Sequence, residues 1–213
     1  QEFYVSESFL EKCSCREHLE EVGYEVVSDS VFSKISDTCT PQGVLCVLKQ
    51  FHYNIEEMLR DKAPLFLLLE NIQDPGNLGT MLRTGEGAGV SGIIMSRDTV
   101  DLYNPKVIRS TMGSIYRVPF YYADDFAAAV HQVQQAGVSV YAAHLRGKNS
   151  YACQDYTKGT AFLIGNEGNG LREETAELAD CYIRIPMEGK VESLNAAVAS
   201  SILMYEAHRQ RAI

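Results

Sequence analysis

Three polar segments of the chain each follow an apolar run and hold side chains that could do chemistry. The first, residues 70–84, contains the turn residues Pro75 and Gly76, then Asn77 and Arg83. A helix starting at this turn would direct backbone N–H groups at an anion, and Arg83 would lie within its first turns, so the segment suits a phosphate group. The plainer interpretation is a strand-to-helix turn in which Asn77 caps the helix. Spacing alone favours neither.

The second segment, residues 162–171, places Gly165, Gly168 and Gly170 after an apolar strand. Glycines let the backbone approach a ligand closely. The spacing matches neither the GxGxxG dinucleotide fingerprint nor a phosphate-binding P-loop, because no Lys-Ser/Thr pair follows. Glu167 is the unusual residue in this run, although an ordinary surface turn would also tolerate it.

The third segment, residues 183–198, closes a strand at Ile185 and leads through a loop to Ser193 and Asn195 at the start of the last helix. Either Ser193 is simply the N-cap and Asn195 a first-turn residue, or two polar residues on either side of Leu194 line a cofactor cleft. Apolar and small residues at helical spacing predict the core face of this helix: Leu194, Ala197, Val198, Ser201, Ile202 and Tyr205. Its other side is also small or apolar, so we expect the helix to be buried on both faces.

Apolar strands alternate with helices from residue 65 onward. We predict strands over 65–70, 92–95, 117–121, 138–143, 161–165 and 181–185, and helices near 77–88, 104–112, 124–136, 171–179 and 193–209. This alternation predicts an α/β domain over 64–213, with a mostly parallel sheet and helices on both faces, whose strand ends would gather the three segments.

A smaller α/β unit is expected over residues 1–50. It would contain strands over 3–5 and 24–27, a helix over 8–21, and a buried strand over 44–48. Residues 51–63 are polar and amphipathic, and we interpret them as a linker between the two parts.

Composition limits the classes of function. The 213 residues carry a net charge of −9. An acidic total does not favour nucleic-acid binding, so an RNA contact would need a local basic patch. Candidates for it are Lys106, Arg109, Arg117, Arg146, Lys148 and Arg172.

No apolar run reaches the roughly 20 residues that span a bilayer, which argues against a membrane protein. No signal peptide is readable, and the first residue is Gln1, which suggests a trimmed N-terminus. Six cysteines form no CxxC pair, so we expect reduced thiols in a cytoplasmic protein and no zinc site.

Taken together, the three segments resemble the signature motifs of the SpoU (TrmH-type) RNA 2′-O-ribose methyltransferases of the SPOUT superfamily. The motifs Asn-Leu-Gly-x-x-x-Arg-Thr, Gly-Asn-Glu-Gly-x-Gly-Leu and Ile-Pro-Met-x-Gly-x-x-x-Ser-Leu-Asn occur in the family's order within residues 65–210. The resemblance implies a trefoil knot at the C-terminal end of the sheet, with S-adenosylmethionine bound in it beside Gly165, Ile185 and Leu194. It also implies a homodimer whose active site is completed at the subunit interface. Residues 1–50 resemble a truncated RNA substrate-binding domain.

The resemblance further implies a catalytic set of Asn77, Arg83, Glu167, Ser193 and Asn195. A guanidinium cannot take up a proton at neutral pH, so we expect Arg83 to hold the target phosphate and stabilise the developing alkoxide. Asn77 would position Arg83 or the ribose, and Glu167 would orient Arg83 or Asn77. Ser193 and Asn195 would order the cofactor loop and place the target. This chemistry requires no metal.

The implied function is methylation of RNA at the ribose 2′-oxygen, and the N-terminal unit favours ribosomal RNA over transfer RNA as the substrate. Three alternatives stay open at this point. The chain could methylate transfer RNA, it could be a non-catalytic RNA-binding module of the same fold, or it could be an unrelated α/β enzyme that uses a nucleotide.

Overall fold

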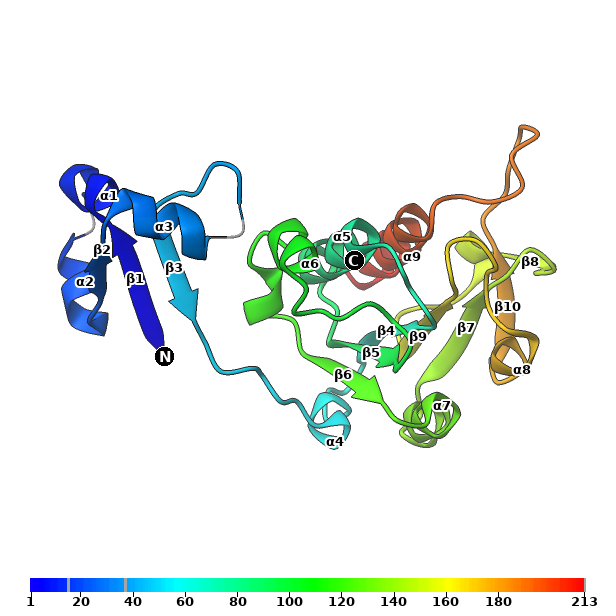
Figure 1. Cartoon of the computed structure of the whole chain (residues 1–213). Helices are drawn as coiled ribbons and strands as arrows, with labels where there is room; N and C mark the ends of the chain where they lie inside the picture. The colour runs from blue at the N-terminus through cyan, green and yellow to red at the C-terminus, as the bar shows by residue number, and fades with distance from the viewer. Residues whose placement is uncertain (15, 37, 213) are drawn as a thin grey trace. The chain divides into compact units, whose positions relative to one another are not determined.

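The computed structural model describes residues 1–14, 16–36 and 38–212. The chain divides into two compact units, Gln1–His52 and Tyr53–Ile213, each of which is described by itself (Figure 1). None of the helices formed by the described residues is long and apolar enough to cross a membrane.

The N-terminal unit is a three-stranded sheet with short helices. Its strands are β1 (Glu2–Ser6), β2 (Glu25–Val27) and β3 (Val44–Val47), in the order β2-β1-β3. The helices are α1 (Glu7–Lys12), α2 (Arg16–Val22) and α3 (Asp29–Ile35). The single helix expected over 8–21 is therefore two helices, with Cys15 between them outside the described residues. The expectation of a buried strand over 44–48 is wrong, because most of β3 is exposed.

The larger unit contains a seven-stranded sheet in the order β6-β5-β4-β9-β7-β10-β8. Every pairing within it is parallel, which confirms the predicted α/β class. All five residues of each of the strands β4, β5 and β9 are buried, as expected for a parallel sheet covered on both faces. The strands are β4 (Leu65–Leu69), β5 (Gly92–Ser96), β6 (Phe120–Ala123), β7 (Ser139–Ala143), β8 (Asn149–Ser150), β9 (Thr160–Ile164) and β10 (Cys181–Arg184).

Helices cover both faces of this sheet, as Figure 1 shows. One face carries α5 (Pro75–Ala88), α6 (Pro105–Ser110) and α9 (Ala196–Arg211). The other carries α4 (Ile55–Met58), α7 (Phe126–Gln135) and α8 (Glu173–Ala176). Short 3₁₀ turns, η1 (Ser114–Tyr116) and η2 (Tyr151–Cys153), follow α6 and β8.

The segment interpreted as a linker contributes to this core. Ile55 and Met58 of α4 are 4% and 6% exposed and belong to the same hydrophobic cluster as Phe66 of β4. Gly92 of β5 leaves the space that Met58 fills, since a Cβ built there would lie 2.1 Å from its Cε. Residues 55–58 are thus a core element of the larger unit.

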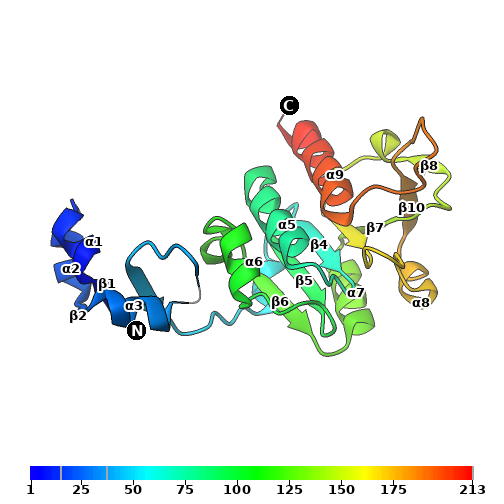
Figure 2. The ribbon, with the colours of Figure 1, turned by 45° about the horizontal axis from the view of Figure 1, so that its top comes forward.

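The last helix, α9, buries a different face from the one predicted. It lies beside α5 (Figure 2) and packs on β9. It buries Ala196, Ala197, Ser200, Leu203, Met204 and Ala207, and of these Ala197 alone belongs to the predicted core face. Two members of the predicted core face, Val198 and Tyr205, are 48% and 50% exposed. The prediction failed because small and apolar residues occur all round this helix, so their periodicity did not identify the side that faces the sheet. Within the larger unit, α9 is covered on one face.

Candidate functional site

The first site segment is the turn from β4 into α5. The N-cap of α5 is Asp74, whose Oδ1 accepts a 2.7 Å hydrogen bond from the backbone N of Asn77. The interpretation of Asn77 as the cap is therefore wrong, since Asn77 is the third residue of the helix and Pro75 occupies its first position. Capping by Asp74 leaves the amide of Asn77 available for other contacts.

That amide belongs to a chain of hydrogen bonds joining the three polar segments. The Nδ2 of Asn77 donates to Oε1 of Glu167 at 3.0 Å. The Nδ2 of Asn195 donates to Oδ1 of Asn77 at 2.9 Å. Residues 90 and 118 positions apart in the sequence thus meet at one edge of the sheet. The structure brings together three of the five predicted catalytic residues.

Glu167 is fixed by the turn after β4. Its Oε2 accepts from the backbone N of Gln73 at 3.1 Å, and its Oε1 accepts from the backbone N of Asp74 at 3.0 Å. Burial disfavours the charge of Glu167, but these bonds and the one from Asn77 outweigh burial and lower the pKa of its carboxyl group. Glu167 is therefore an anion whose oxygens are already engaged.

Asn195 is the N-cap of α9. Its Oδ1 accepts from the backbone N of Ala197 at 2.9 Å and of Val198 at 3.2 Å. The alternative in which Ser193 caps the helix is therefore wrong. The capping bonds fix the side chain of Asn195 in the orientation that lets its Nδ2 reach Asn77.

A cavity of about 320 Å³ lies at the carboxyl ends of β7, β9 and β10, next to this hydrogen-bonded chain. Five predicted site residues line it: Gly165, Glu167, Ile185, Ser193 and Leu194. Glu167 lines both this cavity and a neighbouring hollow that also includes Asn77 and Asn195. We call the cavity the loop pocket and the hollow the polar hollow.

The glycine-rich loop after β9 forms one wall of the loop pocket. A Cβ on Gly165 would lie 2.2 Å from the carbonyl carbon of Gly170, so only glycine fits there. Asn166 and Gly170 exchange two backbone hydrogen bonds of 3.0 and 2.9 Å across the loop. The Oδ1 of Asn166 also accepts from the backbone N of Gly168 and of Asn169, both at 3.0 Å. The loop is thus a closed turn that exposes backbone to the pocket.

Arg83 is not part of this cluster. It lies six residues after Asn77 on α5, which turns it away by about 120° around the helix and moves it roughly 9 Å along the axis. Its side chain is exposed and makes no hydrogen bond or ion pair with the residues that the structure describes. It lines neither the loop pocket nor the polar hollow. Of the two partners considered for Glu167, the structure shows Asn77 and not Arg83.

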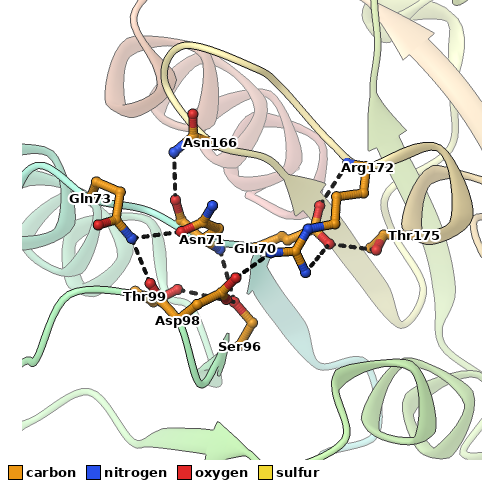
Figure 3. A network of polar contacts seen from close by, with 9 residues as sticks. All are labelled: Glu70, Asn71, Gln73, Ser96, Asp98, Thr99, Asn166, Arg172 and Thr175. Atoms are coloured by element: carbon orange, nitrogen blue, oxygen red, sulfur yellow. Dashed lines mark hydrogen bonds and ion pairs between the residues drawn. The ribbon is translucent and has the colours of Figure 1, made fainter.

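Sequence reasoning missed a second polar network, shown in Figure 3. Its centre is Glu70, which directly follows β4 and is 2% exposed. Asn166 joins it to the glycine-rich loop by donating from Nδ2 to the backbone O of Asn71 at 2.8 Å. A carboxylate directly after a run of five apolar residues was the available signal. Asn71 has a φ of 54°, a conformation that asparagine tolerates better than most residues.

Three of the six residues of the predicted basic patch are paired with carboxylates. Arg117 pairs with Glu86, Arg146 with Glu173, and Arg172 with Asp98 and Glu70. Lys106, Arg109 and Lys148 make no ion pair with the part of the chain that is described. That part also contains no group of three or more His, Cys, Asp or Glu side chains placed to hold a metal.

Comparisons with known proteins identify relatives of this chain. The model of the SpoU rRNA Methylase family matches residues 64–205. The 23S rRNA (guanosine(2553)-2'-O)-methyltransferase RlmP of Bacillus subtilis is 35% identical over 180 residues, which cover 84% of this chain and 70% of that protein.

Two solved structures share the fold. The AdoMet-bound rRNA methyltransferase from Sinorhizobium meliloti has a TM-score of 0.81 at 33% identity, covering 97% of this chain and 79% of that one. A protein whose structure addresses 2-OH methylation of C/U34 on tRNA has a TM-score of 0.64 at 33% identity, covering 70% of this chain and 96% of that one. The chain belongs to the SpoU rRNA methylase family, whose members are RNA methyltransferases that use S-adenosylmethionine.

Proposed function

We propose that the chain methylates the ribose 2′-oxygen of a nucleotide in ribosomal RNA, with Asn77, Arg83, Glu167, Ser193 and Asn195 as its catalytic set. The observation that supports it best is the hydrogen-bonded chain Asn195–Asn77–Glu167 at the mouth of a pocket lined by the glycine-rich loop. This arrangement joins all three family motifs in one place.

The loop pocket suits S-adenosylmethionine. Ile185 and Leu194 offer apolar surface to an adenosine, and the closed loop at Gly165 offers backbone groups to its polar edges. The charged side chains that line the pocket are Glu167, Arg184 and Glu192, and they complement a ligand with a carboxylate, an ammonium and a sulfonium group. When bound, the cofactor supplies a methyl group on a positively charged sulfur.

The remaining chemistry belongs to the chain's own residues. In the transfer, the target 2′-oxygen would bond to the methyl carbon as the carbon–sulfur bond breaks, the neutral thioether would leave, and the hydroxyl proton would pass to solvent water. Arg83 holds the adjacent phosphate and stabilises the negative charge that develops on the oxygen. Because Arg83 lies outside both hollows of its own chain, the proposal places it at a site completed by a second copy in a homodimer.

Glu167 acts as an anchor and not as the proton acceptor. Its carboxyl group accepts three hydrogen bonds and its pKa is lowered, so it is a poor base. Through Asn77 it orients the amide that faces the ribose. Asn195 fixes the same amide from the other side, and Ser193 places the cofactor loop.

Several further features belong to the proposal. The segment from β10 through residues 185–195 to α9, which packs beside β9, would form the trefoil knot. Residues 1–50 would be the remaining part of an RNA substrate-binding domain, and residues 64–213 the methyltransferase domain. The exposed face of α9, including Val198 and Tyr205, would lie in the dimer interface. We also propose that the protein is cytoplasmic and that its reaction needs no metal ion.

The share of this chain that each solved structure matches favours ribosomal RNA as the substrate. The protein named an rRNA methyltransferase matches 97% of this chain, which includes most of the N-terminal unit, whereas the tRNA-related protein matches 70%. Transfer RNA is the second candidate, because that protein resembles the methyltransferase domain.

One experiment distinguishes the two candidate substrates. The chain is incubated with labelled S-adenosylmethionine and, separately, with unmodified ribosomal RNA and unmodified transfer RNA. We expect label in the ribosomal pool and none in transfer RNA. Label in transfer RNA alone would reverse the substrate assignment. Cofactor binding at micromolar concentration without label in either pool would favour a non-catalytic RNA-binding module.

A further inference from the structure

Glu70 is a buried carboxylate to which the proposed reaction gives no role. It lies at the carboxyl end of β4 and is 2% exposed. Its Oε2 accepts from the backbone N of Arg172 at 2.8 Å, and its Oε1 accepts from Oγ1 of Thr175 at 2.5 Å (Figure 3). Burying a carboxylate is costly unless several donors compensate it. Glu70 therefore makes a specific connection between β4 and the segment that follows the glycine-rich loop.

This connection mirrors the one made by Glu167. Glu167 follows β9 and accepts backbone N–H groups of Gln73 and Asp74, which follow β4. Glu70 ends β4 and accepts the backbone N–H of Arg172, which follows β9. Each carboxylate also has one side-chain donor of the other segment, Asn77 for Glu167 and Thr175 for Glu70.

The two carboxylates hold different arms of the glycine-rich loop. Glu167 fixes the entry arm, where the polar hollow lies. Glu70 fixes the exit arm, because Arg172 directly follows Gly170 and Leu171, which line the loop pocket. A shift of the exit arm would thus change the shape of the pocket while the chain Asn195–Asn77–Glu167 stayed in place.

The guanidinium of Arg172 lies 3.7 Å from Oε1 of Glu70 and makes a separate, closer contact with Asp98. The side chains of Arg172 and Asp98 are 51% and 40% exposed, so solvent screens this pair. Exposed ion pairs contribute only about 0–1 kcal/mol to the stability of the folded state. The backbone bond from Arg172 to buried Glu70, and not the exposed ion pair, is therefore the contact that fixes the exit arm.

We propose that Glu70 is a positioning residue for the cofactor, holding the exit arm of the glycine-rich loop in the shape that binds S-adenosylmethionine. This rests on the proposed function, because it assigns the loop pocket to that cofactor. Glu70 touches neither the target nor the reacting atoms. Its loss should therefore weaken cofactor binding and leave the chemical step intact.

The test compares Glu70→Gln and Thr175→Val with the control Asp98→Asn in the full chain. For Glu70→Gln we expect the Kd and KM of S-adenosylmethionine to rise about tenfold, with kcat at saturating cofactor and the KM of RNA within about twofold of wild type. Thr175→Val, which removes one donor to Glu70, should raise the Kd about threefold. Asp98→Asn removes the exposed ion pair of Arg172 and should leave the Kd within about twofold.

Two results would overturn the proposal. One is a Kd for Glu70→Gln within twofold of wild type, and the other is a fall in kcat at saturating cofactor with no change in Kd. If Glu70→Gln does not fold, Thr175→Val replaces it in the test. A Kd for Thr175→Val within twofold of wild type would then overturn the proposal. A wild-type chain that binds no S-adenosylmethionine would instead contradict the proposed function.

Discussion

The substitution Gly165→Ala should abolish cofactor binding at practical concentrations. The added Cβ would lie 2.2 Å from the carbonyl carbon of Gly170 and from the nitrogen of Leu171. Non-bonded carbon atoms need roughly 3.5 Å, so the loop backbone must move by roughly 1 Å. Overpacking of this kind costs about 1–3 kcal/mol.

The same movement breaks the two backbone hydrogen bonds between Asn166 and Gly170, which are 3.0 and 2.9 Å long. Each of these hydrogen bonds contributes about 1 kcal/mol to the stability of the loop's shape. Returning the loop to its binding shape costs about 3–5 kcal/mol, which corresponds to a rise in Kd of roughly 10²-fold to 4 × 10³-fold.

Isothermal calorimetry with S-adenosylmethionine measures this effect, and Gly168→Ala is the matched control. Its Cβ would meet only Oδ1 of Asn166, at an ordinary 3.6 Å, although Gly168 lines the same pocket. We expect the control to bind within about threefold of wild type, with both variants folded by circular dichroism. A folded Gly165→Ala chain with wild-type affinity would refute the reasoning that the closed loop forms the cofactor wall.

Three other predictions follow from the site. Arg83→Ala should lower the rate of methyl transfer by about 10²–10³ while the cofactor Kd stays within about twofold, and a near wild-type rate would show that Arg83 is not a catalytic group. The lowered pKa of Glu167 means that the stability its charge contributes is present above its ordinary value of 4.5 and is lost as the pH falls through the folded pKa. The loss of unfolding free energy in Glu167→Gln, measured in urea, should therefore shrink between about pH 7 and pH 3, and a constant difference would contradict this assignment. Light scattering should give a mass of about 47 kDa, twice 23.7 kDa, whereas a monomer at micromolar concentration would argue against the shared active site.

The central strands β4, β5 and β9 of the larger unit could be predicted from the sequence because they are almost entirely apolar, whereas the short polar strand β8 was not predicted. Runs such as Leu65–Leu69 and Thr160–Ile164 are buried on both faces, so composition alone marks them. The order of the strands was not predictable, since β9 lies between β4 and β7 through contacts between residues far apart in the sequence. The buried face of α9 was predicted wrongly because small residues surround that helix.

The candidate site, like the fold, could be predicted from the sequence only in part. The family resemblance singled out Asn77, Glu167 and Asn195 as a set, but it did not show which side chain each of them contacts. Asn77 and Ser193 were considered as caps in one of two interpretations, because both residue types cap helices well, yet Asp74 and Asn195 are the caps in the structure. The carboxylate of Glu70 after an apolar run was a local signal, but the partner that defines its role, Arg172, is 102 positions away and could not be predicted.

The position of the transferred methyl group tests the central claim most directly. Unmodified ribosomal RNA would be incubated with the chain and labelled S-adenosylmethionine, then hydrolysed with alkali, which cannot cleave beside a methylated 2′-oxygen. The account predicts that the label is recovered in a single alkali-resistant dinucleotide, and that Arg83→Ala loses it. Label recovered on a nucleobase in ordinary mononucleotides, or no label despite saturating cofactor, would contradict the account.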